Sequence, residues 1–128
     1  MDQNNYGSRE ACQRLVDAEI VLETDFVWVD IPLQKKPFNN WVLISNEEYR
    51  KVFNTCASYP ALSMSEVWRE LPDTYSSREI AYLRIAKLEN GDTVCGYLSY
   101  KEPLQIYQNI NPTDALIDLL IWVRKEKP

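Results

Sequence analysis

The sequence predicts a single α+β domain in which a small, mostly antiparallel sheet packs against helices. Three observations predict this fold class: a capped apolar helix over residues 112–125, a capping box that opens a helix over 63–71, and an Asn-Gly pair that turns a hairpin over 80–100. The apolar face of the hairpin and the apolar stripes of the two helices are expected to be buried by packing against one another. The 128 residues suffice for one core and are too few for two, so one domain spans 1–128.

Two elements are predicted near the start of the chain. Ser8 can accept a backbone N–H from the first turn of a helix over residues 8–18, on which Leu15 and two alanines supply an apolar side. Residues 26–31 are rich in β-branched and aromatic side chains and stop at Pro32, which predicts a strand. A helix therefore precedes the first strand.

A loop, a strand and a helix are predicted next. Residues 33–40 read as a loop, and the apolar run 41–44 predicts a second short strand. Asn46 can cap a helix that would carry Tyr49, Val52 and Phe53 on its buried side. The sequence does not specify where this helix ends.

A capping box marks the helix over 63–71. Ser63 and Glu66 can each accept a hydrogen bond from the other's free backbone N–H. Four apolar residues then recur at the spacing of one helix face, and they are Met64, Val67, Trp68 and Leu71. Pro72 ends the helix, because proline cannot continue the hydrogen-bond ladder.

A β-hairpin is predicted over 80–100. Asn90 and Gly91 lie between two runs of alternating side chains, and this pair supplies the positive φ angles that a two-residue turn requires. After the hairpin, residues 104–107 are expected to add a third strand. The sheet is therefore expected to be antiparallel where the hairpin forms it.

The two-residue turn determines which side chains of the hairpin share a face. It places Leu83 opposite Leu98 and Arg84 opposite Tyr97. The face expected in the core consists of Ala81, Leu83, Ile85, Val94, Leu98 and Tyr100. The other face carries Tyr82, Arg84, Tyr97 and Ser99, and it has two interpretations: tyrosines packed across strands beside an exposed arginine, or a binding surface.

The last helix, over 112–125, has more apolar surface than a helix at the edge of a fold needs. Asn111 can cap it, and Asp114 complements the positive helix start. The apolar stripe consists of Leu116, Leu119, Leu120 and Val123, and the opposite polar face of Asp114, Asp118 and Lys125. Ile121 and Trp122 fall on the shoulders of that polar face, where they are either covered by another segment or anchor a partner.

Few active sites can be assembled from this composition. The chain has no histidine, which excludes Ser-His and Cys-His catalytic pairs. Its three glycines are scattered, so it contains neither a P-loop nor a dinucleotide fingerprint. No cofactor and no metal are expected, although Asp73 and Glu79 leave open a magnesium-dependent acid/base pair.

Charge and hydropathy favour a cytoplasmic protein that binds neither membranes nor nucleic acid. The formal charge of −5 disfavours nucleic acid, whose binding depends on lysine and arginine. No apolar run approaches the roughly 20 residues of a membrane span, and the polar residues 1–5 do not resemble a signal peptide. Cys12, Cys56 and Cys95 are odd in number and far apart, which favours reduced core thiols.

Two segments carry a family resemblance. Residues 59–72 read YPALSMSEVWRELP, and residues 111–123 read NPTDALIDLLIWV. They are similar to the Ile-Pro-Ala-Trp-Ser-Leu-Ser segment and the Asn-Pro-x-x-Ala helix of small uncharacterised proteins from phages and prophages of gut bacteria. Leu62 stands where those proteins often have tryptophan, and residues 34–58 form a longer stretch than usual. The resemblance implies a phage-derived accessory protein in the bacterial cytoplasm and assigns no catalytic residue.

The sequence favours a non-catalytic binding protein that engages a host protein or a second copy of itself. Aromatic residues and arginine are frequent interface anchors, so the candidate binding residues are Tyr82, Arg84, Tyr97, Ile121 and Trp122. An alternative is a protein that sequesters a small nucleotide, with Arg84 on the phosphate and tyrosines stacked on the base. A metal-dependent enzyme that uses carboxylates ranks last.

Overall fold

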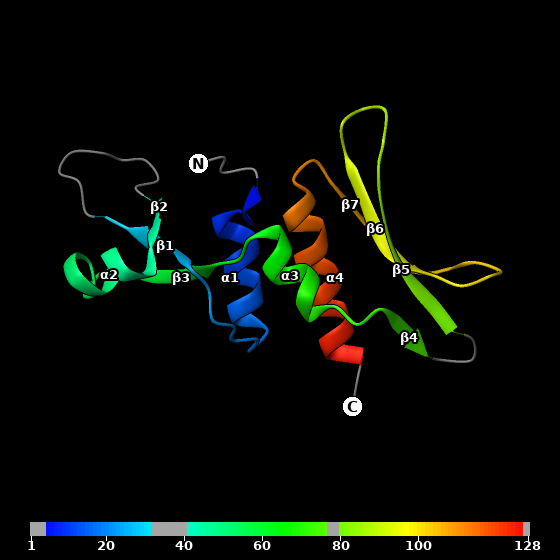
Figure 1. Ribbon diagram of the computed structural model, residues 1–128, viewed down its shortest axis with the longest axis horizontal. Coiled ribbons are helices and arrows are strands. Elements are labelled where there is room, and N and C mark those ends of the chain that lie inside the picture. The colour runs from blue at the N-terminus through cyan, green and yellow to red at the C-terminus, as the bar shows by residue number, and fades with distance from the viewer. Residues whose placement is uncertain (1–4, 32–40, 77–79, 127–128) are drawn as a thin grey trace.

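Helices and two antiparallel sheets alternate along the chain (Figure 1), as the predicted α+β class requires. The structure is a computed structural model that describes residues 5–31, 41–76 and 80–126. Within these residues the elements are α1 (Arg9–Asp17), β1 (Phe26–Asp30), β2 (Trp41–Ser45), α2 (Asn46–Val52), β3 (Ser58–Ala61), α3 (Met64–Glu70), β4 (Thr74–Ser76), β5 (Ile80–Lys87), β6 (Thr93–Leu98), β7 (Pro103–Asn109) and α4 (Pro112–Glu126). The loop expected over 33–40 lies outside the described residues.

The sheets lie at opposite ends of the molecule. Strands β2-β1-β3 form one sheet and strands β4-β5-β6-β7 form the other. Figure 1 shows α1, α3 and α4 between them, with α4 beside the four-stranded sheet. The sequence predicted one sheet, and it did not predict β3 or β4.

Helix α4 is the centre of the core. Its predicted stripe is confirmed, because Leu116, Leu119 and Leu120 are fully buried and Val123 nearly so. The predicted exposure of Asp114 is wrong. This carboxylate is buried and accepts the backbone N–H of Ser8 at 2.7 Å, which joins the start of α1 to the start of α4.

The helix starts follow the local sequence closely. Asn111 Oδ1 accepts the N–H groups of Thr113 and Asp114 at 2.9 and 3.2 Å, as expected for a cap. The capping box of Ser63 and Glu66 is present in both directions. Helix α2 begins one residue earlier than predicted, because a serine and not Asn46 accepts the first-turn N–H. The buried side predicted for this helix is wrong, because no residue of α2 is buried and Val52 is 64% exposed.

The predicted register of the hairpin is wrong by one residue. The Leu88 N–H donates to the carbonyl of Asp92 at 2.8 Å, so the turn contains three residues instead of two. Gly91 occupies the third position with φ 93°, a left-handed conformation that glycine adopts without strain. Leu83 therefore pairs with Tyr97, and Arg84 pairs with Gly96.

A shift of one residue moves a whole strand to the opposite face of its sheet. Ala81 and Leu83 lie on the buried face as predicted, but the residues of β6 on that face are Cys95, paired with Ile85, and Tyr97, paired with Leu83. Three other residues expected in the core lie elsewhere or are exposed: Ile85 is 36% exposed, Leu98 is 38% exposed on the opposite face, and Tyr100 is fully exposed beyond β6. Val94 also lies on the opposite face.

The three cysteines are free thiols. Cys12 and Cys95 are buried as expected, and burial raises their pKa values to about 11 and about 12. Cys56 is only half-buried. In the part of the chain that the structure describes, no helix is both long and apolar enough to cross a membrane.

Candidate functional site

The four-stranded sheet has one covered face and one face that no described helix covers (Figure 1). We call the uncovered side the outer sheet face. Strand register and alternation assign to it Thr74, Ser76, Ile80, Tyr82, Arg84, Ala86, Val94, Gly96, Leu98, Leu104, Ile106 and Gln108. Antiparallel sheets with one solvated face normally place polar side chains on it. Most of this set is apolar instead.

Large apolar side chains gather on the outer sheet face. Ile80, Tyr82 and Ile106 are exposed by 55, 48 and 50%, and Leu98 and Leu104 by more than a third. Single exposed apolar residues are normal on a protein surface, whereas a contiguous group of them marks an interaction site. The outer sheet face carries such a contiguous group.

Arg84 is the only charged residue among the described members of the outer sheet face. Its guanidinium lies 5.5 Å from the centre of the Tyr82 ring, and its Nη1 donates to the carbonyl of Leu83 at 3.0 Å. The cation is therefore drawn back onto its own strand. In a cation–π contact of this kind the guanidinium lies over the aromatic ring, beside the apolar side chains of the face.

A small hollow lies near the middle of the outer sheet face. Its volume is about 70 Å³, and its lining includes Arg84, Val94, Leu98 and Ile106. The Ile106 side chain lies over Gly96, where an added Cβ would come within 2.6 Å of Ile106 Cγ2. Glycine is therefore needed for the close approach of β7 to β6.

The structure separates the sequence-predicted candidates of the hairpin. Tyr82 and Arg84 lie on the outer sheet face, as expected. Tyr97 does not, because the three-residue turn puts it on the covered face, where it is fully buried. Its hydroxyl donates to the carbonyl of Pro72 at 2.7 Å. Burial raises the pKa of this hydroxyl, and Asp73 raises it further.

Trp122 packs on the opposite side of the sheet from Tyr82 and Arg84. Its ring centre lies 4.9 Å from that of Tyr75 and 6.3 Å from that of Tyr97, and the side chain is half-buried. The interpretation that another segment covers this tryptophan therefore describes it better than an exposed anchor does.

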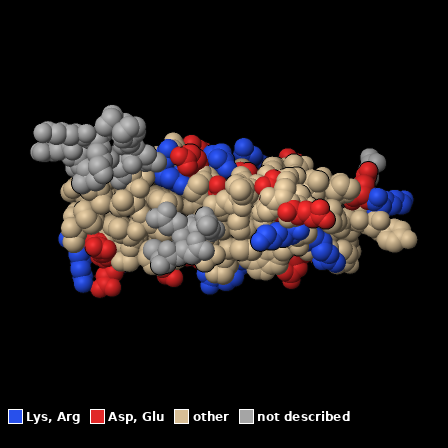
Figure 2. Space-filling view, turned by 90° about the horizontal axis from the view of Figure 1, so that it is seen from above, with Lys and Arg blue, Asp and Glu red and all other residues tan. Residues whose placement is uncertain are grey.

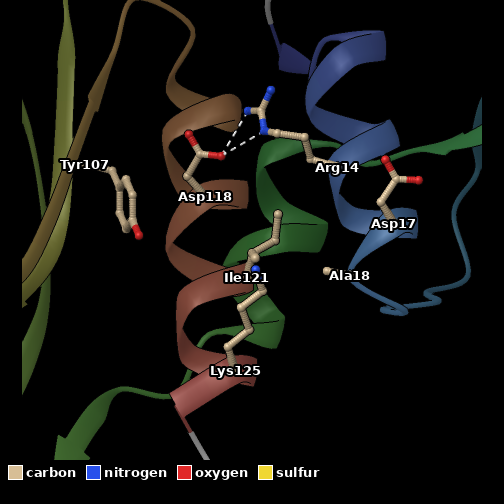
Figure 3. A pocket seen from close by; sticks show the side chains of 7 residues that line it. All are labelled: Arg14, Asp17, Ala18, Tyr107, Asp118, Ile121 and Lys125. Atoms are coloured by element: carbon tan, nitrogen blue, oxygen red, sulfur yellow. Dashed lines mark hydrogen bonds and ion pairs between the residues drawn. The ribbon is translucent and has the colours of Figure 1, made fainter.

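Ile121 lines a separate cavity of about 350 Å³ between α1, α4 and β7 (Figure 3). Arg14 reaches across this cavity and donates to Asp118 Oδ1 from Nη2 at 2.9 Å and from Nε at 3.3 Å. Asp17 and Lys125 add one further charge of each sign. Opposite charges that already pair give this cavity no preference for an anion or a cation.

A surface groove of about 800 Å³ lies between the start of α3 and the segment before β1. Its lining includes Tyr6, Asp25, Met64 and Trp68, with the tryptophan 39% exposed. Asp25 is the only acid among the described residues that line it. The groove therefore presents apolar and hydroxyl groups with no catalytic pair of carboxylates.

The described residues do not form the arrangement that a metal site or a nucleotide site requires. No group of three or more acidic or cysteine side chains there is placed to hold a metal ion. Asp73 is exposed, and Glu79 lies outside the described residues. The nucleotide hypothesis needs tyrosines beside Arg84, and of the two hairpin tyrosines Tyr82 lies there whereas Tyr97 does not. The hollow that Arg84 helps to line has a volume of about 70 Å³, and ligand pockets usually exceed about 300 Å³.

Charged side chains are interspersed in sign over the surface that Figure 2 shows. Lysines and arginines alternate there with acidic residues, and no stripe of one sign runs along this face. A nucleic-acid surface usually gathers lysine and arginine on one side. The face seen in Figure 2 lacks that arrangement.

Sequence reasoning missed Ile80, Leu98, Leu104 and Ile106 as members of one surface. A signal was present, because residues 80–86 are apolar at both alternating positions, with Arg84 the only interruption. A strand that is apolar on both sides is typical of burial on both faces.

No protein-family model, curated protein or solved structure matches this chain, so the similarity to phage proteins stays a prediction.

Proposed function

We propose that this chain is a non-catalytic binding protein that docks another protein on its outer sheet face. One observation supports the proposal above all: large apolar side chains from three neighbouring strands are exposed together there, among them Ile80, Tyr82 and Ile106. Burying an aliphatic side chain stabilises a complex by about 1.5–3 kcal/mol when the burial is complete. Several half-exposed side chains on one face therefore give a partner a strong apolar contact.

The backing of the sheet suits it to recognition. The covered face carries Leu83, Cys95 and Tyr97, which are almost completely buried against the core. A surface built on such strands is ordered before a partner arrives, which lowers the entropy lost on binding. Tyr82 and Arg84 add the residue types that most often dominate binding energy.

The class of partner is a protein, either one of the bacterial host or a second copy of the chain. The resemblance of residues 59–72 and 111–123 to phage proteins favours action in a bacterial cytoplasm. A nucleic acid is disfavoured by the formal charge of −5.

Photo-crosslinking in the organism that encodes the chain tests the proposal. A photoreactive phenylalanine analogue is placed at Tyr82 or Ile106, and at Val52 as a control. Val52 is 64% exposed on α2, at the opposite end of the molecule from the sheet. We expect an adduct of defined higher mass from Tyr82 and Ile106 and none from Val52.

The contrary outcome is equally specific. If neither outer position gives an adduct, or if Val52 gives the same adduct, the outer sheet face is not the docking surface. Circular dichroism of each purified variant shows whether the fold is retained.

A further inference from the structure

We propose that the outer sheet face binds the same face of a second copy, so that two chains form a symmetric dimer with their four-stranded sheets stacked. This inference rests on the proposed function and names its partner. In such a dimer the helices α4 of the two chains lie on the outside, and the two sheets lie face to face about 10 Å apart.

Charge favours a second copy over a basic partner. An acidic chain that recognises a basic protein would place acidic side chains on its docking surface. The described strand residues of the outer sheet face include no Asp and no Glu, and the nearby acid Asp92 lies at the turn end, where its Oδ2 accepts from Gln108 Nε2 at 2.8 Å. Two copies, each with a formal charge of −5, repel one another elsewhere, but away from the turn end they can meet on this face without opposing carboxylates.

Arg84, the one cation among the described residues of the face, does not oppose this pairing. Arg84 is held over Tyr82 and bonded to the carbonyl of Leu83. Its charge is thereby partly satisfied before a second copy arrives. Arginine is also the cation that interfaces tolerate best, because its planar guanidinium stacks on aromatic rings.

The face offers both a hollow and exposed side chains of a size to fill it. Leu98 and Ile106, which are 38 and 50% exposed, help to line the hollow of about 70 Å³. This volume lies between that of one water, about 30 Å³, and that of a cavity that holds benzene, about 150 Å³. The hollow therefore suits the end of one aliphatic side chain. In a two-fold contact the same patch supplies both protrusion and hollow.

The area of the face is that of a weak dimer. Four strands spaced about 4.8 Å apart make a sheet about 19 Å wide, and a strand of eight residues such as β5 is about 26 Å long. The other strands are shorter, and β4 has only three residues, which reduces the product to roughly 400 Å² on each chain. Two such faces together bury roughly 800 Å², somewhat less than the roughly 1,000 Å² at which stable specific interfaces begin. The dimer is therefore expected to dissociate on dilution.

Sedimentation velocity over a series of concentrations tests the dimer. The purified chain is compared with Leu98→Lys and Ile80→Lys, which place a cation on the outer sheet face, and with Val52→Lys, which places one on α2. The two-fold axis would bring each outer lysine into the contact twice. We expect the mass of two chains for the wild type and for Val52→Lys. For each outer variant, the dissociation constant should rise at least tenfold while the circular dichroism spectrum is unchanged.

Two outcomes would overturn the inference: a wild-type chain of single mass at every concentration, or a dimer that both outer variants retain. The crosslinking experiment separates this failure from failure of the proposed function. A single-mass chain whose Tyr82 position still crosslinks to a different protein leaves the docking surface intact and replaces its occupant. The absence of any Tyr82 or Ile106 adduct removes the docking surface as well.

Discussion

The two faces of the four-stranded sheet are both apolar, but only one of them is covered. Leu83, Cys95 and Tyr97 on the covered face are at most 8% exposed. Ile80 and Ile106 on the outer sheet face are at least half exposed. The covered face has α4 packed across β6 and β7, whereas no described helix reaches the other side.

This difference distinguishes two roles of an apolar side chain in the sheet, which are to stabilise the fold and to bind a partner. On the covered face the apolar residues hold the fold together, because removing them leaves a cavity in a close-packed core. On the outer sheet face they add little to the stability of a single chain, since water reaches them in the folded state. Their presence there is explained by a partner and not by the core.

A pair of leucines on neighbouring strands provides the largest contrast. Leu83→Ala should lower the free energy of unfolding by about 2–4 kcal/mol, because the leucine is 8% exposed. Leu98→Ala, from a site 38% exposed, should cost less than about 1 kcal/mol in dilute solution. Urea denaturation measures both. Equal losses would show that the outer sheet face is part of the core.

Alkaline pH tests how dry the covered face is. The pKa of Cys95 is raised by burial to about 12 from an ordinary value near 9. Below pH 9 both folded and unfolded chains keep this thiol protonated, so stability does not depend on it. Above pH 9 the unfolded chain loses the proton first, and stability falls as pH rises towards 12.

The expected fall is on the order of 2 kcal/mol per buried thiol by pH 11. Urea denaturation of the wild type and of Cys95→Ala between pH 8 and 11 measures it. The variant should lose less stability than the wild type over this interval. Parallel curves would show that water already reaches Cys95.

Two tyrosine hydroxyls, one on each face, give a smaller contrast. Tyr97→Phe removes the buried hydroxyl that donates to the carbonyl of Pro72, which should cost about 1–2 kcal/mol. Tyr82→Phe should change stability by less than about 0.5 kcal/mol, because Tyr82 is 48% exposed. Thermal denaturation measures both variants. A larger loss for Tyr82→Phe would reverse the assignment of the two faces.

The turn that sets these faces gives the smallest effect. Gly91 has φ 93° and no atom near its missing Cβ, so Gly91→Ala should cost about 1 kcal/mol of backbone strain alone. Gly91→Asn should cost less, since asparagine tolerates positive φ. Denaturation in urea measures the two variants. Equal stability of Gly91→Ala and wild type would contradict the three-residue turn and the register that depends on it.

Elements with strong local signals could be predicted from the sequence. Ser63 with Glu66, and Asn111 with its proline, specify helix starts through hydrogen bonds that span three residues or fewer. Strand β3 contains Pro60, which argues against a strand unless the strand lies at a sheet edge, as β3 does. Strand β4 has three residues, too few for a visible alternation.

The candidate site was only half predictable for a related reason. Tyr82 and Arg84 lie on the outer sheet face in either register, because they belong to the same strand as the core residue Leu83. The positions of Leu98 and Tyr97 depend on whether the turn has two or three residues. The dipeptide at 90–91 is compatible with both lengths, so the sequence alone assigned β6 to the wrong faces.

Because α4 is synthesised last among the described elements, its synthesis determines when the core can form. This helix lies downstream of every strand and helix that it covers, and its first turn bonds residues about 105 positions earlier, through Asp114 to Ser8 and Asn111 to Tyr6. While a ribosome is still making α4, Leu83, Tyr97 and Leu15 have no cover. Such a chain completes its core only after α4 has emerged, and until then proteases and chaperones meet an open sheet with two apolar faces.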